Sequence, residues 1–133
     1  MKEGEGPELN FWRAPIDNDR WIVNEWKKAG LDNLKHRIDD VKVESIDDTT
    51  VEVVVESRIA PPIFAYGFNC RYIYKINNDG DIILTVKGLP EGDILDLPKI
   101  GLKMTLPREF EKVTWYGRGP GESYIDSKLA NRV

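Results

Sequence analysis

The stretch FNCRYIYKINNDGDIILTVKGL, residues 68–89, is the clearest indicator of the fold class, because polar and apolar side chains alternate on both sides of a turn signal. Every second residue from Phe68 to Ile76 is apolar or aromatic, and Ile82, Leu84 and Val86 continue this spacing. Such alternation is typical of half-buried β-strands. The residues NNDG between the two runs tolerate positive φ and favour a tight hairpin. The stretch therefore predicts an antiparallel pair of strands.

Further alternating runs lie on both sides of this hairpin, at residues 41–46 (VKVESI), 50–57 (TVEVVVES), 100–106 (IGLKMTL) and 112–117 (KVTWYG). The segment APPIFAYG carries Pro61 and Pro62, which cannot donate to a strand ladder, and it is expected to form a loop or the irregular start of the Phe68 strand. Several strands joined by short turns predict an all-β fold, a layer of an antiparallel sandwich.

One segment, DNDRWIVNEWKKAGLDNL, departs from the strand pattern. Its apolar residues Ile22, Trp26 and Ala29 have helical spacing. Asp19 can cap the first turn and Gly30 can lie just beyond the last, so the segment predicts a single helix of about three turns.

Composition excludes several classes of protein. The 133 residues correspond to a single domain spanning 1–133 or part of one, and the net charge of −4 with scattered Lys and Arg argues against nucleic-acid binding. No apolar run reaches the roughly 18 residues that cross a bilayer, and no secretory signal follows Met1. We expect a soluble protein without membrane association, and composition leaves its compartment open.

Cys70 and His36 are the only residues of their kinds, which excludes an internal disulfide and a clustered Cys/His zinc site. We expect a buried Cys70 in a strand and His36 in an exposed polar connection. Most of the Trp and Tyr side chains are expected in the core, because they alternate with polar residues.

The motif WYGRGPGESYIDSK, residues 115–128, combines glycines with carboxylates and allows three interpretations. A dinucleotide-binding turn is disfavoured because Glu122 occupies the third glycine position. Glu122 and Asp126 could serve as a carboxylate pair in glycoside hydrolysis. Alternatively, Gly117 and Gly119 adopt backbone angles closed to other residues, and the carboxylates tie the loop to Arg118 or to backbone amides.

Four segments, in this order, resemble the C-terminal domain of bacterial β-galactosidases of glycoside hydrolase family 2: NFWRAPIDND, WKKAGLDNL, LPKIGLKMTLP and VTWYGRGPGESYIDSK. The resemblance extends over nearly the whole chain. It implies that the chain is the first part of that domain, a fragment of an antiparallel supersandwich similar in fold to galactose mutarotase, with one short helix.

The resemblance also implies a supporting role. In this family the catalytic acid/base and nucleophile are glutamates of a (β/α)8 barrel, and neither is in this sequence. No catalytic residue, metal ligand or cofactor is therefore expected here, and the Mg and Na ions of the parent enzymes bind elsewhere. The expected partners are the remaining domains of the parent, and its substrate is a galactoside of the lactose type. The resemblance to bacterial enzymes implies the bacterial cytoplasm or periplasm, without deciding between them.

Arg13, Asp17, Asn18 and Asp19 match the family motif that lies near the active-site entrance, where they would shape its mouth. The alternative is structural, with Arg13 paired to Asp17 and Asp19 capping the helix. Gly117, Gly119, Glu122, Tyr124 and Asp126 match a framework motif. This sequence departs from the family in lacking a long loop after Asp19, and in having Ser123 and Ser127 where Asn and Arg are common.

Two functions follow as alternatives: a non-catalytic framework region of a β-galactosidase, or a free-standing carbohydrate-binding module whose aromatic side chains stack on sugars. Because a partial sandwich leaves edges and apolar surface open, the chain is also expected to self-associate.

Overall fold

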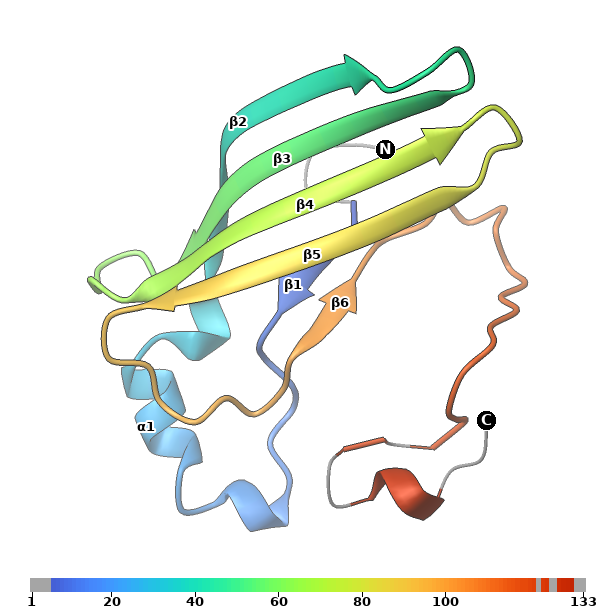
Figure 1. Ribbon diagram of the computed structural model, residues 1–133. Coiled ribbons are helices and arrows are strands. Elements are labelled where there is room, and N and C mark those ends of the chain that lie inside the picture. The colour runs from blue at the N-terminus through green and yellow to red at the C-terminus, as the bar shows by residue number, and fades with distance from the viewer. Residues whose placement is uncertain (1–5, 122, 125–126, 131–133) are drawn as a thin grey trace. The chain divides into compact units, whose positions relative to one another are not determined.

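The computed structural model describes residues 6–121, 123–124 and 127–130. These belong to two compact units, one within residues 2–104 and the other within residues 105–133. The first unit contains all the strands that the described residues form (Figure 1). Its main element is an antiparallel sheet in the order β2-β3-β4-β5, formed by Lys35–Ser45, Thr50–Ala60, Gly67–Asn77 and Ile82–Glu91. The expected all-β, antiparallel fold is confirmed.

The hairpin between β4 and β5 is the one predicted from NNDG. Asn77 N donates to Asp81 O over 3.2 Å, and Gly80 N donates to Asn77 O over 3.1 Å. Gly80 has a φ of +88°, in the left-handed region that favours glycine. The side chain of Asn77 also accepts hydrogen bonds from the backbone amides of Asp79 and Asp81, so local polar contacts fix the register of the two strands.

The register of the sheet gathers the apolar side chains on one face. Val55, Tyr72 and Val86 are aligned across β3, β4 and β5, and so are Val53, Tyr74 and Leu84. Side chains alternate between the two faces along a strand, and these two rows are two residues apart, so both lie on the same face. The opposite face carries charged pairs such as Glu56 with Arg71 and Glu52 with Lys75.

A second, two-stranded sheet pairs β1 (Glu8–Asn10) with β6 (Gly101–Lys103). Leu9 of β1 and the following Phe11 pack against one half of the apolar face, where they bury Ile59, Phe68, Cys70 and Tyr72. The rings of Phe11 and Phe68 stack with centroids 4.0 Å apart. Leu9 N donates to the hydroxyl of Tyr72 over 2.9 Å, so this core also satisfies a buried backbone group.

The helical segment is shorter than predicted. It consists of α1 (Val23–Lys28) between two single 3₁₀ turns, Asp17–Asp19 and Leu31–Asn33. Trp26 is buried on α1 and its Nε1 donates to Asp96 O over 2.8 Å. Gly30 follows the helix with a φ of +75°, as expected for a residue just past a helix end. None of the described helices is long and apolar enough to cross a membrane.

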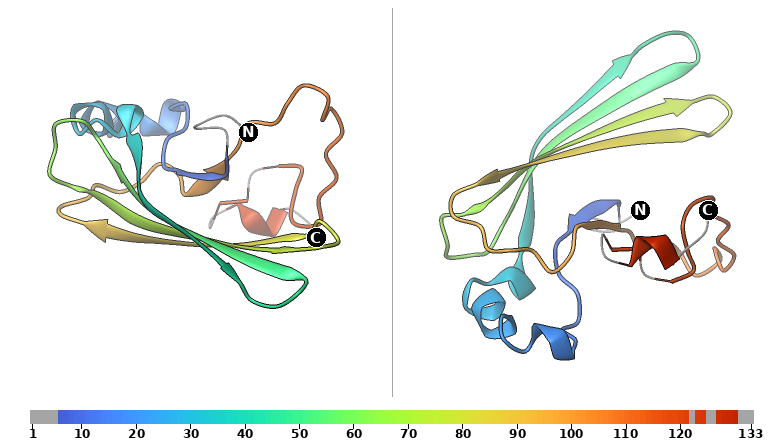
Figure 2. Two further views of the ribbon diagram at one scale, coloured as in Figure 1. Left: turned by 90° about the horizontal axis from the view of Figure 1, so that it is seen from above. Right: turned by 60° about the horizontal axis from the view of Figure 1, so that its bottom comes forward.

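The long strands extend past β1 and α1, so the end of the sheet that carries the two hairpin turns stands away from this core (Figure 2). Several apolar side chains of the same face are exposed there, among them Val41, Val43, Val51 and Ile82. One half of the apolar face is therefore covered and the other half is open within residues 6–104.

Four predictions about local structure are wrong or only partly correct. Residues 112–117 are not a strand, and β6 has three residues where seven were expected. His36 lies in β2 and not in a connection, because that strand begins at Lys35. The expectation for the aromatic residues holds for Trp26 and Tyr72 but fails for Trp21, Trp115 and Tyr116, which are exposed. Cys70 is buried in β4, as expected.

The second unit is irregular in its described part, apart from a 3₁₀ turn at Lys128–Ala130. Arg118 donates from Nη1 to Lys128 O over 3.1 Å, and Lys128 N donates to Tyr124 O over 2.7 Å. These bonds close the loop that contains the glycine-rich motif. They run to backbone carbonyls, while Glu122 and Asp126, the carboxylates that were expected to hold the loop, lie outside the described residues.

Candidate functional site

The RAPIDND segment, residues 13–19, is organised around an ion pair between Arg13 and Asp19. Arg13 Nη1 lies 2.5 Å from Asp19 Oδ2, and Nη2 lies 2.9 Å from Oδ1, so the contact is bidentate. Arg13 Nε also donates to Pro98 O over 2.9 Å. Bidentate arginine–carboxylate contacts are both strong and geometrically specific. Arg13 therefore joins the 3₁₀ turn at Asp17–Asp19 to the segment that leads into β6.

The carboxylate of Asp19 has a second role at this turn. Its Oδ2 accepts a hydrogen bond from Ile16 N over 2.8 Å, which satisfies a backbone donor at the start of the 3₁₀ turn. The hydrogen bond from Arg13, followed by that from Ile16, lowers the pKa of Asp19 below its usual value. Asp19 is buried and ionised, and both of its oxygens are engaged in structural contacts.

The structural alternative considered for this motif is thus correct in kind and wrong in detail. Arg13 pairs with Asp19 and not with Asp17, and Asp19 does not cap α1, because that helix begins four residues later. Asp17 and Asn18 are exposed. The two carboxylates of the motif therefore have different environments, since Asp19 is buried and Asp17 is exposed. The role of Arg13, Asp17, Asn18 and Asp19 at an active-site mouth stays a prediction.

An exposed aromatic side chain follows the motif. Trp21 is 80% exposed, and the guanidinium carbon of Arg20 lies 4.6 Å from the centroid of its ring. A cation over the face of an indole is a favourable contact. Most Trp side chains were expected in the core, and Trp21 is an exception because it lies off the side of the segment that Ile22, Trp26 and Ala29 share.

The second candidate motif is described only in part, because Glu122 and Asp126 lie outside the described residues. Gly117 and Gly119 both have a φ of +159°, which borders on extended backbone and is far from the left-handed turn region. Tyr124 is exposed, and its carbonyl oxygen accepts hydrogen bonds from the backbone amides of Ser127 and Lys128. The framework role of the motif stays a prediction.

A cavity beside β1 was not predicted from the sequence. It has a volume of about 370 Å³, and its polar lining includes Glu8, Asp32, His36 and Lys103, with Trp12 among the apolar residues. His36 Nε2 lies 3.9 Å from Glu8 Oε2, too far for a hydrogen bond. Burial, followed in importance by the opposing effects of Glu8 and Lys103, lowers the pKa of His36. No local pattern brings Glu8 and His36 together, since they meet only when β1 crosses the end of the sheet.

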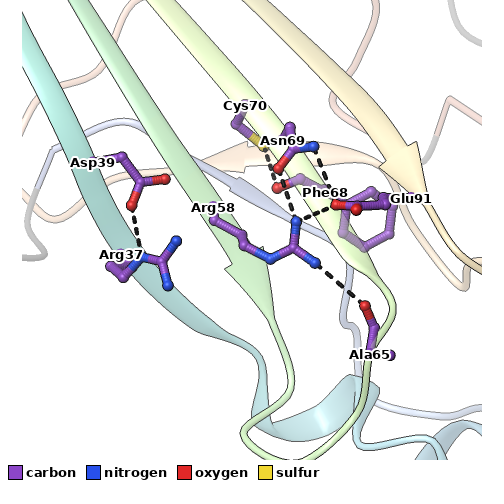
Figure 3. A network of polar contacts seen from close by, with 8 residues as sticks. All are labelled: Arg37, Asp39, Arg58, Ala65, Phe68, Asn69, Cys70 and Glu91. Atoms are coloured by element: carbon purple, nitrogen blue, oxygen red, sulfur yellow. Dashed lines mark hydrogen bonds and ion pairs between the residues drawn. The ribbon is translucent and has the colours of Figure 1, made fainter.

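The polar face of the sheet carries a network that fixes the loop between β3 and β4 (Figure 3). Arg58 donates to Glu91, to Asn69 Oδ1 over 2.9 Å and to Ala65 O over 3.3 Å, while Asn69 Nδ2 donates to Glu91 Oε2 over 3.2 Å. Arg58 and then Asn69 lower the pKa of Glu91. Every group in this network has a structural partner, so the network serves to hold three strands and a loop together.

Metal binding finds no support among residues 6–121, 123–124 and 127–130, where no group of three or more His, Cys, Asp or Glu side chains could hold an ion. Burial raises the pKa of Cys70 to about 11, so this thiol stays protonated at neutral pH.

Comparison with known proteins identifies the family. The family model described as "Beta galactosidase small chain" matches residues 1–133. A β-galactosidase of Kluyveromyces lactis is 38% identical over 135 aligned residues, which cover 96% of this chain and 13% of that protein. The β-galactosidases of Vibrio cholerae and Staphylococcus xylosus are 35% and 32% identical, over 88% and 92% of this chain and 12% of each relative.

These relatives are much longer than the chain, which spans only 12–13% of their length. The match nevertheless extends over all four segments that suggested the resemblance, from RAPIDND to the glycine-rich motif. The chain belongs to the β-galactosidase small-chain family.

Proposed function

We propose that this chain is a non-catalytic framework region of a β-galactosidase, an enzyme that hydrolyses terminal β-galactosides such as lactose. The observation that carries the proposal is the state of Asp19. A general acid must hold a proton near neutral pH, whereas Arg13 keeps the pKa of Asp19 low and occupies both of its oxygens. The buried carboxylate of the RAPIDND motif is thus engaged in shaping the chain, not in proton transfer.

Within the parent enzyme, the loop that contains Asp17 and Asn18 forms part of the wall of the active-site mouth. Both side chains are exposed, while Arg13 and Asp19 fix the backbone beneath them. The catalytic carboxylates, the metal ions and most of the sugar-binding groups reside in other domains of the parent. This distribution of functional groups among the domains agrees with the small share of each relative that the chain covers.

A carbohydrate-binding module is the second candidate, and the exposed ring of Trp21 favours it. Aromatic faces of this kind can pack against sugar rings in shallow sites. Trp12 also lines the cavity beside β1, which is within the size range of small-ligand pockets. The two candidates differ in one respect that can be measured: only a module binds sugar by itself.

Isothermal titration of the chain with lactose and with galactose separates the candidates. The framework proposal predicts no saturable heat up to millimolar sugar. Saturable binding that disappears in Trp21→Ala, or in Trp12→Ala, would instead establish a binding module and overturn the proposal. Glucose in the same titration controls for nonspecific heats of dilution.

A further inference from the structure

The two outer edges of the main sheet differ in how they are protected. β2 has a register shift between Ile38 and Asp40 and carries charged side chains along its length. Its residues are exposed as a whole, although the side chain of His36 is only 29% exposed. Irregularities and charges on an edge strand discourage pairing with another strand. The edge formed by β2 therefore has the features of an edge that faces solvent.

The edge formed by β5 lacks this protection over most of its length. Its pairing with β4 runs from Gly67 with Glu91 to Ile76 with Ile82 without a register shift. Ile82, Ile83 and Leu89 are 60%, 66% and 68% exposed, on both faces of the strand. A long edge without a bulge and with exposed apolar side chains is a template for strand addition.

The outward-pointing backbone groups of β5 can be assigned from the hairpin. Asn77 N donates to Asp81 O, so this pair is hydrogen-bonded. In an antiparallel ladder, hydrogen-bonded and non-hydrogen-bonded pairs alternate. The amides and carbonyls that face away from β4 are accordingly those of Ile82, Leu84, Val86 and Gly88. Among the described residues, β5 has β4 as its one neighbour in the sheet.

Pro90 sets the limit of this edge. Pro90 and Phe68 form a non-hydrogen-bonded pair, as Gly88 and Cys70 do. The backbone nitrogen of Pro90 therefore faces away from β4, and it has no N–H to donate to an added strand. The available edge thus runs from Ile82 to Gly88. On its apolar side it continues into the open half of the sheet face, where Ile82 and Val51 are exposed.

We infer that the outer edge of β5, from Ile82 to Gly88, accepts a β-strand of the parent polypeptide from outside residues 1–133. The inference rests on the proposed function, since it requires a longer parent, and the relatives have ample further chain because this one spans 12–13% of them. The added strand extends the sheet, and its apolar side chains on the face of Leu84 and Val86 pack beside the exposed side chain of Ile82.

Hydrogen exchange of individual backbone amides in the parent enzyme tests the inference. The amides of Ile82, Leu84, Val86 and Gly88 are expected to be as protected as those of Ile83 and Thr85, which face β4. The matched controls are the amides of Val41 and Val43, which by the same alternation from Ile46 N to Thr50 O face outward on β2. These are expected to exchange on the order of 100-fold faster.

Fast exchange at the four outward amides of β5, equal to that of Val41 and Val43, would overturn the inference. Protection that is lost when the parent is diluted would also overturn it, because the partner strand would then come from a second copy. Turnover of a β-galactoside by the same sample is scored separately. An active parent with an unprotected β5 edge refutes the strand alone, and an inactive parent with a protected edge refutes the proposed function alone.

Proline substitution provides a second measurement. Ile82→Pro removes an outward amide of β5, and Val43→Pro removes one of β2, from side chains that are 60% and 65% exposed. In the parent, Ile82→Pro is expected to lower Tm and to expose the remaining outward amides of β5, while Val43→Pro leaves them protected. Equal effects of the two substitutions on the β5 amides would contradict the inference.

Discussion

Arg13 and Asp19, which are separated by five residues, form a two-point contact with Nη1–Oδ2 and Nη2–Oδ1 distances of 2.5 and 2.9 Å. The same carboxylate accepts the amide of Ile16, and the same guanidinium donates to Pro98 O. A single ion pair therefore sets the course of the RAPIDND loop and attaches it to the segment before β6. Its removal should affect the fold of the first unit as a whole.

Asp19→Asn is expected to lower Tm, whereas Asp17→Asn leaves it unchanged within error. The amide at position 19 cannot accept both Arg13 bonds, and the half-buried guanidinium loses the charge of Asp19. Thermal melts of the two variants, followed by circular dichroism, provide the measurement. Equal Tm values for Asp19→Asn and the original chain would show that the pair contributes nothing to stability.

Trp26→Ala is expected to destabilise the chain by about 3–5 kcal/mol, because a large buried aromatic side chain is lost. The loss includes the hydrogen bond from Nε1 to Asp96 O. Trp21→Ala removes an equally large but exposed ring and is expected to change stability by less than about 0.5 kcal/mol. Urea titrations of both variants compare the two sites on one helical segment. Similar effects would mean that α1 does not pack as described.

Ser57→Ala is expected to raise stability by up to about 1 kcal/mol. Ser57 Oγ is buried and has no hydrogen-bond partner among the described residues, so its removal relieves a desolvation cost. Ser45→Ala is the matched control on the neighbouring strand, since Ser45 Oγ donates to Asp47 O over 2.9 Å at an exposed position. A clear loss of stability in Ser57→Ala would reveal a hydrogen bond to this hydroxyl.

Stability is expected to fall on acidification through the titration of His36. Burial lowers its pKa in the folded chain from the usual 6.5, so the unfolded chain binds the proton first as the pH drops. The contribution is present above about pH 6.5 and is lost as the pH falls toward the folded pKa. Because His36 is the only histidine, NMR can follow it directly. A measured pKa above 6.5, or an unchanged pH profile in His36→Gln, would contradict this assignment.

Local patterns in the sequence were sufficient for the hairpin of β4 and β5, because both the turn residues and the alternation lie within 22 contiguous residues. The position of Gly30 just past the end of α1 was also predictable, because a glycine readily adopts the positive φ found there. The helix itself was overestimated, since Asp19 was assigned to capping when its carboxylate is in fact bound by Arg13.

Contacts between distant residues could not be predicted in this way. Arg13 and Pro98 are 85 positions apart, and the contact exists only because β1 and β6 pair. The run KVTWYG alternates as a strand should, but a strand requires hydrogen-bonding partners, and alternation does not specify them. The same limitation applies to the cavity beside β1, where Glu8 and His36 come from strands in different sheets.

The central claim, that this chain supports catalysis without performing it, is tested most directly by its activity alone. The purified chain is incubated with a chromogenic aryl β-galactoside beside Asp19→Asn, Glu122→Gln and Asp126→Asn, and release of the aryl group is followed. We expect no turnover above the uncatalysed rate in any sample, because retaining hydrolysis requires an acid and a nucleophile about 5 Å apart in a cleft. Turnover by the original chain that survives purification and disappears in Glu122→Gln and Asp126→Asn would contradict the account and identify the glycine-rich motif as an active site.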